Sequence, residues 1–66
     1  MLSESRRTIA ERHVREGRRI VERQREIISW QETHGHNTFY SEGLLQSFEQ
    51  SLAIFEDDLR RIVKGS

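Results

Sequence analysis

Apolar and small residues recur at alternating steps of three and four along the first half of the chain. The residues on this line are Ala10, His13, Gly17, Ile20, Gln24, Ile27, Gln31 and His34. This spacing gathers side chains on one face of an α-helix, at the positions through which helices pack. The pattern predicts a first helix over residues 4–34, with Ser3 or Ser5 as its N-cap and Glu4 in its first turn.

The second half of the chain repeats the pattern more clearly, over residues 39–63. Its apolar line is Ser41, Leu45, Phe48, Leu52, Phe55, Leu59 and Ile62. Between the two helices lies a predicted turn of Gly35, His36, Asn37 and Thr38. Gly35 suits the left-handed conformation that ends a helix, and Thr38 or Asn37 suits the next N-cap. Such a short connection predicts an all-α fold, an antiparallel two-helix hairpin forming a single domain over residues 1–66.

A turn centred on His36 sets the register of the hairpin and its expected core. Gly17 then faces Phe55, which gives a reason for a glycine in mid-helix; a helix bend, solvent exposure of Gly17 or a register shifted by three or four residues are the alternatives. His13 would be buried, and its interface could respond to pH. The expected hairpin core is Ala10, His13, Gly17, Ile20, Gln24, Ile27, Leu45, Phe48, Leu52, Phe55, Leu59 and Ile62.

A second apolar line of the first helix consists of Val14, Val21 and Ile28, which repeat every seven residues. A hairpin of this size builds only a small core, and one partner helix does not cover so wide an apolar face. We therefore expect Val14, Val21 and Ile28 to form a dimer interface that closes a homodimeric four-helix bundle. The alternative is one wide core stripe within a single hairpin.

Composition removes several classes of protein. The chain has no cysteine, which excludes disulfides and thiol chemistry, and its formal net charge is zero. It has no apolar run long enough to cross a bilayer and no secretory leader pattern, so we expect a cytoplasmic protein without a membrane partner. We find no catalytic motif, and we expect neither an enzyme nor a cofactor.

Two groups of side chains could still bind something. His34 and His36 flank Gly35, but a zinc site needs three or four ligands, so we expect no metal. A row of arginines on the outer face of the first helix could follow a phosphate backbone. Glutamates are mixed with them, which favours a solvated face with ion pairs. The possible nucleic-acid face is Arg12, Arg15, Arg18, Arg19 and Arg25.

A longer motif runs through the middle of the chain, in the pattern EG…RQ…GH[ND]T…LL..FE. The matching positions are Glu16, Gly17, Arg23, Gln24, Gly35, His36, Asn37, Thr38, Leu44, Leu45, Phe48 and Glu49. This pattern resembles that of a group of short alphaproteobacterial helical-hairpin proteins. The resemblance covers about two-thirds of the chain, and it implies no particular activity.

These observations together favour a small non-enzymatic interaction module. Its partners would be a second copy of itself, as a homodimer, and another protein. The alternative function is nucleic-acid binding through the arginine face of the first helix.

Overall fold

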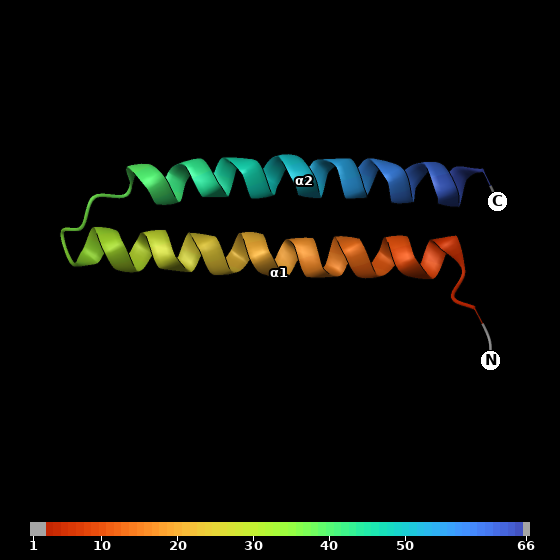
Figure 1. Cartoon of the computed structure of the whole chain (residues 1–66), viewed down its shortest axis with the longest axis horizontal. Helices are drawn as coiled ribbons and strands as arrows, with labels where there is room; N and C mark the ends of the chain where they lie inside the picture. The colour runs from red at the N-terminus through yellow and green to blue at the C-terminus, as the bar shows by residue number, and fades with distance from the viewer. Residues whose placement is uncertain (1–2, 66) are drawn as a thin grey trace.

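The computed structural model describes residues 3–65, which form two α-helices joined by one turn (Figure 1). Helix α1 spans Arg6–Thr33 and α2 spans Phe39–Lys64. The helices lie side by side and antiparallel, so the start of α1 and the end of α2 lie opposite the turn. The predicted all-α hairpin is confirmed. Among the described residues, neither helix combines the length and apolarity needed to cross a membrane.

Helix α1 begins at a serine cap. The Ser5 side chain accepts a hydrogen bond from the Thr8 backbone N–H at 3.1 Å, which satisfies one of the free donors at a helix start. Glu4 precedes the helix instead of lying in its first turn as expected, and its carboxylate pairs with Arg12. Of the two serines considered, the cap is Ser5.

The turn is built around Gly35. Its φ of 69° lies in the left-handed region, which glycine adopts without steric cost. The N–H of His36 donates to the carbonyl of Gln31 at 2.8 Å, and the N–H of Gly35 donates to that of Glu32 at 3.2 Å. This pair of bonds is the Schellman arrangement that closes a helix C-terminus. The predicted role of Gly35 is confirmed.

Thr38 is the N-cap residue of α2, but the neighbouring asparagine makes the side-chain hydrogen bond at this helix start. The Phe39 N–H donates to Asn37 Oδ1 at 2.8 Å, whereas Thr38 makes no side-chain cap bond. Asn37 was the competing candidate; it lies one residue before the cap position and satisfies the free N–H of the first helical residue.

The buried line of α1 is rotated from the expected one. Val14 and Val21 are 4% and 3% exposed, and Ile28 is 8% exposed, all within the single hairpin. Their assignment to a dimer interface is therefore wrong, because α2 of the same chain already covers them. The buried residues of α1 are Ala10, Val14, Gly17, Val21, Gln24 and Ile28.

Three residues expected in the core lie at its edge instead. Ile20 is 47% exposed, His13 is exposed, and Ile27 is only half-buried. The His13 ring still contacts the ring of Phe55, at 5.1 Å between centroids. The expectation that His13 and Ile20 are buried is wrong, because Val14 and Val21 occupy the positions against α2.

The apolar line of α2 faces α1 as predicted, but it is less completely covered. Ser41 is 6% exposed, and the larger side chains after it are half-buried. These half-buried side chains are Leu45, Phe48, Leu52, Phe55, Leu59 and Ile62. No large side chain of the described residues is completely enclosed. A single partner helix leaves one edge of each of these residues in contact with solvent.

The register across the seam is fixed by a close approach and by one buried hydrogen bond. A Cβ at position 17 would lie 3.1 Å from Leu52 Cδ1 and 3.7 Å from Phe55 Cδ2. The predicted contact of Gly17 with Phe55 is confirmed, and Leu52 is the nearer neighbour. Towards the turn, Gln24 Nε2 donates to the backbone oxygen of Ser41 at 2.9 Å. This bond pairs a buried amide that would be costly to leave without a partner.

Two mid-helix glycines provide a matched test of this packing. We expect Gly17→Leu to destabilise the hairpin by roughly 1–3 kcal/mol, since the new side chain overlaps Leu52. Gly43 is exposed with no atom within 4 Å of an added Cβ, so Gly43→Ala should stabilise it by up to about 1 kcal/mol. Urea unfolding followed by circular dichroism, at one protein concentration, measures both. A stabilising Gly17→Leu would contradict the close approach.

Candidate interaction surface

One side of the seam between the helices is spanned by ion pairs. Arg18 of α1 pairs with Glu56 of α2 at 3.2 Å, and Arg25 pairs with Glu49 at 2.9 Å. The arginines are seven residues apart and so are the glutamates, so the two pairs form successive rungs of a ladder. We call this the ladder side. The four side chains are 38–64% exposed, so each pair stabilises the hairpin only modestly, by about 0.2–1 kcal/mol.

The period of seven predicts like charges at the next rung of the ladder. A further step of seven along each helix, towards the turn, leads from Arg25 to Glu32 and from Glu49 to Glu42. Both glutamates are exposed. Two carboxylates at one rung would repel where the preceding rungs attract.

The other side of the seam has apolar residues in place of ion pairs. On this side α1 presents His13, Ile20 and Ile27, which repeat every seven residues, and also Ile9. Helix α2 presents Tyr40 and Leu44 near the turn. Ile20 is 47% exposed and Tyr40 is 77% exposed, while Ile27 and Leu44 are half-buried. We call this surface the open face, and it consists of Ile9, His13, Ile20, Ile27, Tyr40 and Leu44.

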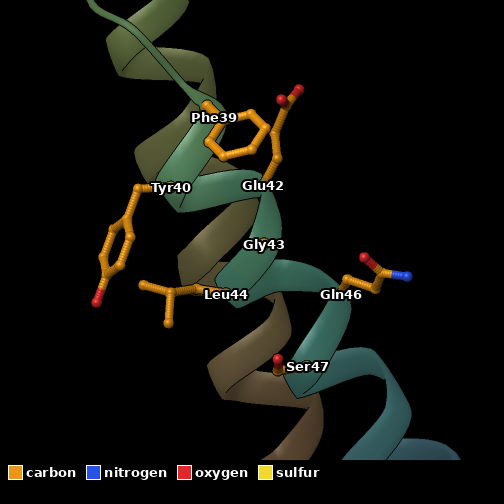
Figure 2. Close-up of a pocket in the computed structure, with 7 residues that line it drawn as sticks. All are labelled: Phe39, Tyr40, Glu42, Gly43, Leu44, Gln46 and Ser47. Atoms are coloured by element: carbon orange, nitrogen blue, oxygen red, sulfur yellow. The ribbon is translucent and has the colours of Figure 1, made fainter.

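Figure 2 shows how α2 separates the two sides near the turn. Tyr40 and Leu44 point to one side of the helix, and Glu42 and Gln46 point to the other. Between them the bare backbone of Gly43 forms the floor of a shallow groove of about 430 Å³. This groove continues the apolar surface from the open face onto the outer face of α2. It offers space for an apolar side chain of a partner.

The turn gathers three aromatic rings. Trp30 stacks on His34, with ring centroids 4.1 Å apart, and meets His36 edge-on at 5.1 Å. His34 Nδ1 lies 2.8 Å from the Trp30 carbonyl oxygen, which requires a proton on that nitrogen. The two histidines therefore pack against the tryptophan. In residues 3–65, no three His, Asp or Glu side chains lie close enough together to hold a metal ion.

Most arginines of the possible nucleic-acid face take part in ion pairs. Arg12, Arg18 and Arg25 are paired with carboxylates. Arg18 and Arg25 lie beside the seam, on the ladder side, and Arg15 and Arg19 are exposed on the adjoining surface of α1. Two of the five guanidinium groups are therefore engaged with carboxylates of α2.

Sequence reasoning missed the ladder and most of the open face. Residues 18 and 25 were taken as outward arginines, and Tyr40 was given no role. The signal was present: an arginine line with a period of seven in α1 matches a glutamate line with the same period in α2. Such a match indicates which side of each helix borders the seam, because opposite charges pair across it.

Comparison with protein-family models, with curated proteins and with solved structures finds no match to this chain. The resemblance to short alphaproteobacterial hairpin proteins therefore stays a prediction.

The like-charged rung provides a test of the ladder. We expect Glu32→Arg to place a guanidinium opposite Glu42 and to stabilise the hairpin by about 0.2–1 kcal/mol in urea unfolding. An arginine in the last turn of α1 also interacts favourably with the helix dipole, whatever lies opposite. The same substitution in a Glu42→Gln background separates the two effects. An equal gain in both backgrounds would show that no third rung forms.

Proposed function

We propose that this chain is a non-enzymatic protein–protein interaction module that assembles into a homodimeric four-helix bundle through its open face. The observation that carries the proposal is the difference between the two sides of the seam. Ion pairs span the ladder side of the seam, whereas Ile20, Ile27 and Leu44 form an apolar surface on the open face. Contiguous apolar surface on a small protein is typical of an interaction site.

The surface area of the chain supports a partner of substantial size. The hairpin has 5554 Å² of accessible surface, whereas a compact monomer of 7.9 kDa would have about 4,400 Å². The excess is larger than the roughly 800 Å² that each partner buries in a typical stable complex. A second hairpin laid on the open face would cover the half-buried side chains of α2 that one helix leaves wet.

Two further features favour a second copy over a nucleic acid. The formal net charge of zero means that two copies do not repel one another as whole molecules. Of the arginines that would have to bind phosphates, Arg18 and Arg25 pair with glutamates of α2.

Adjacent residues distinguish this interface from the hairpin core. We expect Ile20→Glu to yield a folded monomer, because Ile20 is exposed on the open face. Val21→Glu should instead unfold the chain, because it places a charge at a position only 3% exposed. Arg15→Glu, on an exposed part of α1 away from the open face, serves as the control and should remain dimeric. Light scattering gives the mass of each variant, and circular dichroism gives its helicity.

Two results would contradict the proposed dimer or its interface. A wild-type chain that stays monomeric and helical at tens of micromolar would overturn the proposal. A dimer that survives Ile20→Glu with unchanged affinity would place the interface elsewhere on the hairpin.

A further inference from the structure

Charge is separated along the length of the hairpin, although the chain as a whole is neutral. The turn brings the beginning and the end of the described chain to one end of the molecule. No lysine or arginine occurs between Arg25 and Arg60, a stretch that includes the whole turn. Divided at the middle of the helices, near Glu22 and Gln50, the turn half has five acidic and two basic residues. The other half has six acidic and nine basic residues, so the formal charges are −3 and +3.

The charged residues at the two ends of the hairpin produce this charge separation. The like-charged rung of Glu32 and Glu42 lies in the turn half. At the other end, Arg60, Arg61 and Lys64 end α2 beside the first arginines of α1. Each hairpin is therefore an elongated body, 49 Å in its longest dimension, with ends of opposite sign.

Two hairpins that share the open face can lie in two ways. With both turns at the same end, the two negative halves lie beside one another, as do the two positive halves. With the turns at opposite ends, each negative half lies beside a positive one. Packed helices approach to 8–10 Å, which is about one Debye length at physiological salt, so neighbouring charges across the interface still interact.

We infer that the second copy packs antiparallel on the open face, with the turn of each hairpin beside the chain ends of the other. A twofold axis perpendicular to the helices relates the two copies, so the same surface serves both. This inference rests on the proposed homodimer and adds its orientation. The excess accessible surface supports the presence of a partner, and the charge separation favours its antiparallel orientation.

Spin labels on single cysteines test the orientation directly, because the natural chain has no cysteine to replace. His36→Cys labels the exposed turn, and Lys64→Cys labels the opposite end. In an antiparallel dimer, two turn labels should be about 40 Å apart, the length of α1 at 1.5 Å per residue. Two end labels should be similarly far apart. A mixed dimer with one label of each kind should give a short distance, below about half that length.

The parallel orientation reverses all three distances, so short turn-to-turn and end-to-end distances would overturn the inference. The mass of the labelled protein is measured first. A monomer would refute the proposed dimer itself, whereas a dimer with short turn-to-turn distances would refute only its orientation.

Salt dependence tests the electrostatic basis of that orientation. The Debye length falls from about 30 Å at 0.01 M to 3 Å at 1 M salt. We expect the dissociation constant of the dimer to rise several-fold over this range. An unchanged or lower dissociation constant would contradict the role of the charged ends. Glu42→Lys, which reduces the negative charge of the turn half, should weaken the dimer at low salt and have little effect at high salt.

Discussion

The hairpin depends on the fit between small residues of α1 and large residues of α2 across a single seam. Gly17 allows Leu52 and Phe55 to come close to the α1 backbone, and Val14 and Val21 fill the adjoining layers. With only two helices there is no second layer to compensate for a poor fit. The rotation of each helix about its own axis is therefore set at this seam, and every surface feature of the molecule follows from it.

That rotation gives the two sides of the seam their opposite chemistry. With Val14 and Val21 against α2, the next residues around α1 on one side are Arg18 and Arg25, within reach of glutamates. On the other side they are isoleucines, of which Ile20 is 47% exposed. Exposed ion pairs stabilise a fold weakly, whereas exposed apolar surface favours association. The same packing thus places ion pairs on the ladder side and apolar side chains on the open face.

Polar contacts at the turn end support this arrangement. The buried bond from Gln24 to the Ser41 backbone joins the helices near the turn, and the Schellman bonds of Gly35 fix where α1 ends. The bond that the Phe39 N–H donates to Asn37 Oδ1 lies at the start of α2. Because both helices are rigid, these few residues set the register of the whole hairpin.

The sequence by itself determined the two helices, the turn at Gly35, the inward line of α2 and the contact of Gly17 with Phe55. It did not determine the inward line of α1, because two lines share Ala10, Gly17 and Gln24 and differ by a rotation of only about 50°, at 100° per residue. Periodicity within one helix accommodates both. Tertiary packing decided between them, since one rotation buries Val14 and Val21 and also aligns arginines with glutamates of α2. The burial of these valines and the alignment of the charges both depend on residues of α2. The sequence of α1 alone therefore does not reveal them.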